Sequence, residues 1–214
     1  MNDTSAWVAA VATVTVLVAY EMALLLLQRH QPAQLARAVH VRLREDWFTA
    51  ISQQRGSEIL AVQTLRNSLM SATMVASTAV LGLMGSVTLA APSLYATFVD
   101  GEALTVHFSP RLALELILMA ILLASLVCSV MAVRYYNHAG YISGMPVESQ
   151  QRKVWAVTGA LYLRRAGLLY SWGLRHLIMV APILASIVYP WAGPVAACLV
   201  AMVLLAFDRF SAVQ

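Results

Sequence analysis

Ionisable side chains inside otherwise apolar runs are the residues of this sequence with the clearest chemical potential. Glu21 interrupts the first apolar run, Glu115 lies near the start of a later one, and Arg175 and His176 open another. An ionisable group within a membrane is energetically expensive and usually faces a partner charge or a water-filled cavity. These residues therefore either form an ion site, or form interhelical salt bridges that fix the packing of the helices.

Six side chains are thus candidates for a pore or an ion site: Glu21, Arg66, Asn67, Glu115, Arg175 and His176. Arg66 and Arg175 enter apolar runs from the same side, at about the depth of Glu21, so either arginine is a possible partner of this acid. Such arginines also reach the interface without any partner. Glu115, on the same helical side as Ser125 and Ser129, either attracts cations near an outer pore mouth or contacts headgroup water.

The second apolar run carries small residues at helical spacing. They are Ser68, Ala72, Ala76, Gly82 and Ser86. Small side chains let neighbouring helices approach closely, and they also leave room within a narrow pore. The pattern therefore indicates either helix packing or a pore lining.

The sequence carries no motif for metal, nucleotide or nucleophilic chemistry. Its histidines lack the paired spacing of metal ligands, and no P-loop, GxGxxG or GxSxG pattern occurs. Cys128 and Cys198 both lie in apolar runs, where we expect free thiols that pack as small hydrophobic groups. We therefore expect no enzyme activity, no cofactor and no bound metal.

The composition indicates that membrane helices position the candidate residues. Of the 214 residues, 60% are hydrophobic and 11% are charged, and the mean hydropathy is +0.73. A soluble domain has about 45–50% apolar and about 25% charged residues, so this chain has too little polar surface to cover a soluble body of its size. This excludes a disordered chain, a disulfide scaffold and an ordinary soluble enzyme.

We expect a single all-α integral membrane domain over residues 1–214, built as a bundle of about five transmembrane helices. A span needs about 20 apolar residues, and such runs cover residues 7–27, 68–91, 112–133, 174–189 and 191–207. Pro92 is expected to end the second span. The last two runs are short and are joined by a tight turn, so the alternative has four spans and a re-entrant pair.

Two further segments predict helices in the cytoplasm. Apolar residues recur at every fourth position in the first segment, which predicts an amphipathic helix over residues 33–55 that ends at Gly56. Ser57 is expected to cap a helix that runs unbroken into the second span. Residues 148–168 also have a helical pattern and are expected to continue into the fourth span. The sequence RYYNHAGY at 134–141 favours a turn or a helix cap.

The distribution of charge predicts the orientation of the chain. All of the 14 Lys and Arg residues except Arg111 lie in segments that share one side of the five-span arrangement. Basic residues favour the cytoplasm, which places the N-terminus outside and the C-terminus inside a bacterial inner membrane. Asp3 rather than a basic region precedes the first run, so we expect a retained span and no cleaved signal peptide. The basic excess sets the topology and contacts anionic lipid, and no nucleic-acid partner is expected.

Four groups of residues resemble a known family when they are taken in order. They are QTLRN at 63–67, RYYNHAGY at 134–141, GLR at 173–175 and GP at 193–194. Over nearly its whole length the chain resembles the domain-of-unknown-function family numbered five hundred and ninety-nine, multi-pass membrane proteins of bacteria and plants. The resemblance implies a helical membrane protein without an assigned biochemical activity, and it transfers no functional residue to this chain.

These features predict a small homo-oligomeric channel or transporter for ions or small solutes in the lipid bilayer. We expect the thin bundle of five spans in one copy not to enclose a conduit by itself, whereas a ring of copies can line a conduit with the second span of each copy. The alternative is a non-conducting membrane scaffold or complex subunit that binds a partner through its cytoplasmic helices.

Overall fold

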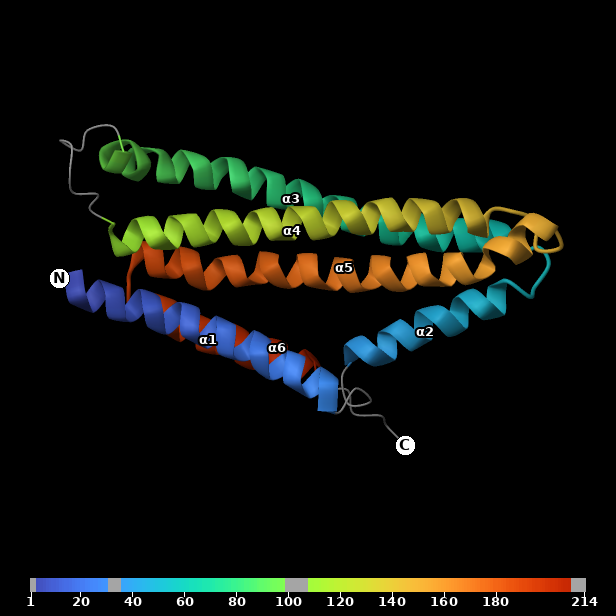
Figure 1. Cartoon of the computed structure of the whole chain (residues 1–214), viewed down its shortest axis with the longest axis horizontal. Coiled ribbons are helices and arrows are strands. Elements are labelled where there is room, and N and C mark those ends of the chain that lie inside the picture. The colour runs from blue at the N-terminus through green and yellow to red at the C-terminus, as the bar shows by residue number, and fades with distance from the viewer. Residues whose placement is uncertain (1–2, 31–35, 99–107, 209–214) are drawn as a thin grey trace.

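The computed structural model describes residues 3–30, 36–98 and 108–208, and nearly all of these residues lie in helices (Figure 1). No strand occurs in these ranges, so the all-α prediction is confirmed. The six helices are α1 (Asp3–His30), α2 (Ala36–Ile51), α3 (Glu58–Phe98), α4 (Pro110–Ser143), α5 (Gln150–Val188) and α6 (Ala192–Asp208).

Four helices of the described chain, α1, α3, α4 and α5, are long and apolar enough to cross a membrane, which indicates a membrane protein. Helix α6 is also apolar but has only 17 residues. It therefore extends over about 25 Å, slightly less than the roughly 30 Å of a hydrocarbon core. A fifth crossing by α6 stays a prediction.

Helix α4 continues well beyond the predicted span. It begins at Pro110, where the hydroxyl of Ser109 accepts a hydrogen bond of 3.2 Å from the amide of Leu112. It then runs to Ser143, so RYYNHAGY is helical and the predicted turn is wrong. Tyr136 and Ile142 within or just after this sequence are buried, because this segment continues the apolar face on which the neighbouring helices pack.

Helices α3 and α5 each contain an internal proline. Helix α3 passes through Pro92 to Phe98, so the predicted stop at Pro92 is wrong. Helix α5 combines the predicted extension with the predicted fourth span in one element, with Pro182 inside it. A proline removes one backbone hydrogen bond, but neighbouring helices and local adjustments commonly compensate for this loss in membrane helices.

The turn between α2 and α3 differs from the prediction. Helix α2 ends at Ile51 and not near Gly56, which has a φ of +77° in the left-handed region that glycine adopts readily. The hydroxyl of Ser57 donates to the carbonyls of Ile51 and Gln54, at 2.7 Å each. Ser57 therefore closes the turn with its hydroxyl donor, whereas the predicted cap would use the hydroxyl as an acceptor.

The bundle has two successive apolar cores along its long axis. Helices α4 and α5 pack along each other, α3 packs on α4, and α1 runs beside α6 in the same direction (Figure 1). One core joins α1 and α6 to α4 and α5, and we name this region the α6 half. The other core joins α2 to α3, α4 and α5, and we name it the α2 half.

Arg152 holds the α2 half together. Its side chain is almost fully buried, at 2% exposure. It donates to the carbonyls of Ile142 at 2.6 Å and Met145 at 3.2 Å and to the hydroxyl of Ser52 at 3.2 Å. Its guanidinium also lies 5.6 Å from the ring centroid of Phe48. One cation thus joins α2, α5 and the carboxyl end of α4, where the helix dipole favours positive charge.

Substitution by alanine is expected to have opposite effects at two glycines in the α2 half, Gly159 and Gly140. A Cβ at Gly159 would lie 2.5 Å from Phe48 and 3.1 Å from Ile142, whereas a Cβ at Gly140 would have nothing within 4 Å. We expect Gly159→Ala to destabilise the protein by about 1–3 kcal/mol through overpacking. Gly140→Ala is expected to stabilise it by up to about 1 kcal/mol through helix propensity.

Denaturation of both variants in detergent measures the difference. A stabilised Gly159→Ala variant would contradict the close packing of α2 on α5.

Candidate functional site

A buried ion pair links three helices near the junction of the two halves. Arg175 of α5 is 7% exposed and Asp208, the last residue of α6, is equally buried. The guanidinium of Arg175 donates to the Asp208 carboxylate and to the hydroxyl of Tyr20 on α1. The Tyr20 hydroxyl in turn donates to Asp208 Oδ2 at 2.7 Å. Both charges are therefore compensated inside the bundle.

The predicted pairing of Glu21 is only partly supported. Glu21 follows Tyr20 on α1, is partly buried and interacts electrostatically with Arg175. Arg175, however, forms its ion pair with Asp208. The other proposed partner, Arg66, lies on the exposed side of α3 in the α2 half and lines a separate cavity. Glu21 and Arg175 are thus brought together as neighbours, whereas Arg66 is not part of this group.

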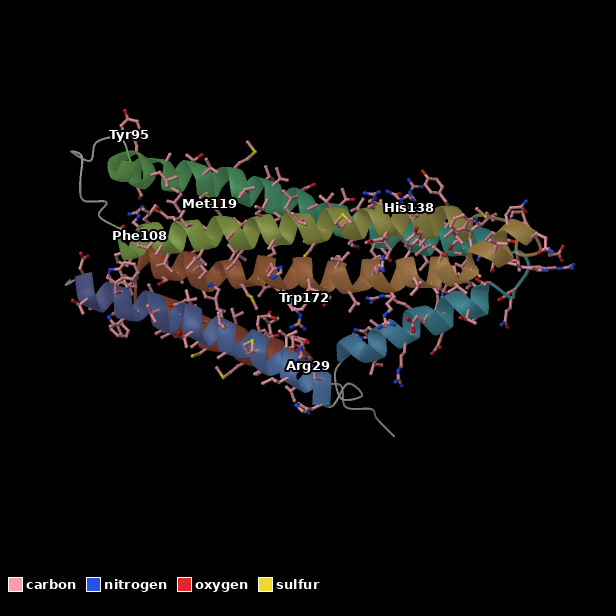
Figure 2. The ribbon with its side chains drawn as sticks, viewed as in Figure 1. Arg29, Tyr95, Phe108, Met119, His138 and Trp172 are labelled. Carbon is pink, nitrogen blue, oxygen red and sulfur yellow. The ribbon has the colours of Figure 1, made fainter. Side chains whose placement is uncertain are left out.

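Aromatic side chains lie beside the ion pair. His176 stacks with Trp172, with ring centroids 5.7 Å apart. Trp172 points from α5 toward the side where α1 ends and α2 begins, and Arg29 lies at that end of α1 (Figure 2). The predicted site residue His176 therefore lies next to the buried ion pair, and the stacking contact with Trp172 helps to position its ring.

Helices α4 and α5 approach each other closely beside Arg175. The hydroxyl of Ser125 donates to the carbonyl of Gly173 at 2.7 Å. A Cβ at position 173 would lie 3.3 Å from the Ser125 carbonyl and 3.4 Å from the Ser129 amide. Ser125, Ser129 and Glu115 are all fully buried, in agreement with the predicted shared side of α4. The two serines serve helix contact at this depth.

Glu115 occupies a separate position near the start of α4. Its side chain is 0% exposed, and Oε1 accepts a hydrogen bond of 2.9 Å from Nε of Arg111 one turn earlier. Oε2 is buried and accepts no hydrogen bond from the described part of the chain. Trp7 and Phe108 stack at the same end of the molecule, 5.9 Å apart (Figure 2). This carboxylate is therefore enclosed by the protein.

The predicted small residues of α3 mostly face α4. Ala72 and Ser86 are buried, and a Cβ at Gly82 would lie 2.9 Å from Leu122 of α4. Ser68 and Ala76 are partly buried. These positions favour the packing alternative over a pore lining.

The opposite face of α3 is exposed and carries a different set of small and polar residues. It contains Asn67, Ser71, Thr78, Gly85 and Thr88. The three hydroxyl groups donate to backbone carbonyls one turn earlier, at 2.9–3.1 Å. Of the predicted site residues, Asn67 and its neighbour Arg66 lie on this exposed side of α3.

Cavities of the described chain lie in the α2 half, at the junction of the two halves and along the first half of α1. One of them has about 710 Å³ and lies between α3 and α4, with Arg66, Asn137 and Tyr141 among its lining residues. A smaller cavity of about 330 Å³ is lined by His40, Arg175 and Asp208. No group of three His, Cys, Asp or Glu side chains suited to a metal ion occurs among the described residues.

Sequence reasoning missed Tyr20 and Asp208 as site residues. Asp208 stands at the end of an apolar run rather than inside one, so its position alone indicates an interfacial charge. The available signal was the depth of Arg175. A buried base at that level is stabilised by an acid at the same level, and the end of α6 supplies one.

Removal of one partner of the buried pair is expected to be costly. We expect Arg175→Met to destabilise the protein by about 3–5 kcal/mol, because Asp208 would remain buried without its cation. The double variant with Asp208→Leu is expected to recover most of this loss, since an apolar pair of similar size replaces both charges. Thermal denaturation in detergent measures both effects.

The matched control is Arg164→Met, because Arg164 forms an exposed pair with Glu45 at 3.7 Å. We expect a change of at most about 1 kcal/mol there. Equal losses in the Arg164 and Arg175 variants would contradict the structural importance of the buried pair.

Comparison with known proteins identifies the family but assigns no activity. No curated protein and no solved structure matches the chain. The model of one family, described as a protein of unknown function, DUF599, matches residues 8–213. The match covers every described helix except the first turns of α1. The chain therefore belongs to the DUF599 family, as the resemblance of its motifs implied.

Proposed function

We propose that the protein is a non-enzymatic, homo-oligomeric membrane channel or transporter in which the exposed face of α3 lines a path for ions or small solutes. The observation that carries this proposal is the one-sided attachment of α3. This helix packs mainly on α4, and its outward face carries amide, hydroxyl and glycine positions along a length sufficient to cross a bilayer.

The spacing of these positions suits contact between copies. Exposed residues recur on α3 at intervals of four and three, at Asn67, Ser71, Met74, Thr78, Leu81, Gly85 and Thr88. This is the heptad spacing of left-handed helix packing, and small or polar residues favour close contact between membrane helices. Since the hydroxyl protons already bond to backbone carbonyls, their oxygens remain as outward acceptors for water or a cation.

The proposed orientation follows from the charges. The α2 half holds most of the arginines, so it lies in the cytoplasm under the positive-inside rule. The N-terminus then lies outside a bacterial inner membrane, and Glu115 with Arg111 lies near the outer surface. Labelling of single engineered cysteines in intact cells and in inverted vesicles tests this orientation. Labelling of the α2 half from outside would contradict it.

Flux and oligomeric state test the proposed function together. We expect the protein in nanodiscs to have the mass of several copies, and proteoliposomes to show flux of monovalent cations. Thr78→Leu and Gly85→Leu are expected to reduce this flux at least tenfold, because each adds a bulky side chain to the proposed lining. Val203→Leu is the control, since Val203 is exposed on α6 away from α3.

A monomer, or equal flux in all three variants, would contradict the assignment of the path to α3. Glu115→Gln separately tests the enclosed carboxylate. We expect weaker cation selectivity without loss of folding, because the amide retains the shape of the side chain while it removes the charge.

A second candidate function rests on the apolar surface of the α2 half. Val154, Val157 and Leu161 lie along one side of α5 and are 74%, 73% and 46% exposed. Apolar residues that cluster on a surface in water commonly mark a binding site. A membrane scaffold that binds a partner here would show no flux, and it would retain its mass and folding in the Thr78→Leu and Gly85→Leu variants.

A further inference from the structure

Arg44 on α2 is a basic side chain that forms no ion pair with an acid among the described residues. It is partly buried at the junction of the two halves, and no ion pair or hydrogen bond joins it to the described residues. The neighbouring acid, Glu45, pairs with Arg164 of α5. Asp208 is already bound by Arg175 and Tyr20. These two acids are therefore bound by other side chains.

The position of Arg44 depends on a glycine of the facing helix. Its guanidinium lies directly over Gly167 of α5, where a Cβ would come 2.6 Å from Cζ and 2.9 Å from Nε. Any larger residue at position 167 would displace the guanidinium. The contact thus places an unpaired cation at a defined point between α2 and α5.

Hydrogen-bond donors surround a small cavity beside this cation. The cavity has about 170 Å³ and is lined by His40, Arg44, Gly167, Tyr170, Ser171 and Leu174. Its imidazole, guanidinium and two hydroxyl groups can all donate to an anion. The neighbouring cavity of about 330 Å³ shares His40, Ser171 and Leu174 and extends to Arg175.

The other side of Arg44 is apolar. A mainly apolar cavity of about 280 Å³ is lined by Arg44 together with Leu43, Trp47, Leu65 and Leu163, and also by Thr64, Ser68 and Tyr136. Arg44 therefore lies between a polar cavity and an apolar one. Arg44 lies close to the level of Arg175 and Asp208. The apolar run of α5 begins at this level and that of α6 ends there. A ligand with an anionic group and a hydrocarbon part would fit both sides.

We propose that Arg44, with His40 and Ser171, binds an anionic phosphate group in the cavity between α2 and α5. The planar guanidinium binds two phosphate oxygens at once, and basic pockets between membrane helices bind lipid headgroups at the cytoplasmic surface. The phosphate belongs either to a membrane phospholipid or to a soluble phosphate compound, and the two sources are separable by experiment. This proposal does not depend on conduction through α3.

Native mass spectrometry of the delipidated full chain tests the lipid source. We expect the first phosphatidylglycerol molecule to bind at least about five-fold more tightly than phosphatidylcholine, the effect of one basic residue near an anionic headgroup. Arg44→Gln and Gly167→Ala are expected to abolish this preference. Arg42→Gln is the matched control, since it removes an exposed charge from the same helix.

Thermal denaturation in phosphate and in chloride at equal ionic strength tests the soluble source. Stabilisation by inorganic phosphate that is lost in Arg44→Gln would support a soluble ligand, whereas the lipid preference alone would support a headgroup. The proposal would be overturned if the unmodified protein bound both lipids equally tightly and was equally stable in phosphate and in chloride. A preference that survives Arg44→Gln or disappears equally in Arg42→Gln would also overturn it.

A folding control keeps the result decisive. Arg44→Lys retains the charge but loses the planar donor pair, and we expect an intermediate preference together with an unchanged elution profile. If Arg44→Gln fails to fold, the unmodified protein and Arg44→Lys decide the question. An Arg44→Lys variant with an undiminished preference would contradict recognition by the guanidinium.

Discussion

The cost of an isolated charge in a low-dielectric interior governs the architecture of this protein. Arg175 lies where the apolar part of α5 begins, and its charge is stable there only with an acid and further hydrogen-bond partners. Tyr20 from within α1 and Asp208 from the end of α6 meet this requirement. Because both partners must reach the same point, α1 and α6 are fixed against α5. This contact and the apolar core of the α6 half together hold these helices in place.

The α2 half solves a similar problem in another way. Arg152 is buried without a carboxylate in direct contact, and backbone carbonyls at the end of α4 and the Ser52 hydroxyl accept its hydrogen bonds. Arg44 is the contrasting case, since its position over Gly167 leaves the guanidinium open to a cavity. Arg175, Arg152 and Arg44 thus have different roles. Buried Arg175 pairs with an acid, buried Arg152 closes a helix end, and the partly buried Arg44 is available for a ligand.

Much of the fold follows from the sequence, and the site follows only in part. Composition and apolar runs predicted the helical membrane class, because each apolar run reflects a requirement that acts locally along the chain. The length of α3 beyond Pro92 and of α4 through RYYNHAGY was not predictable by local signals, since contacts with neighbouring helices decide there. The sequence identified Arg175 as an expensive residue but not its partner. Partner choice depends on which helices are neighbours, and spacing along one chain does not contain that information.

Continuous helices through both halves have a mechanical consequence. Helix α5 carries Arg152, Gly167 and Arg175 on one uninterrupted backbone, and α4 runs beside it from Pro110 to Ser143. Neither helix has a loop between the two apolar cores that could absorb a rotation. A change in bilayer thickness changes the tilt of membrane helices. Because α4 and α5 are continuous, a change in their tilt would displace the far end of the α2 half. The cavity beside Arg44 lies between α2 and α5, near the junction of the two halves, so such a movement would change its shape.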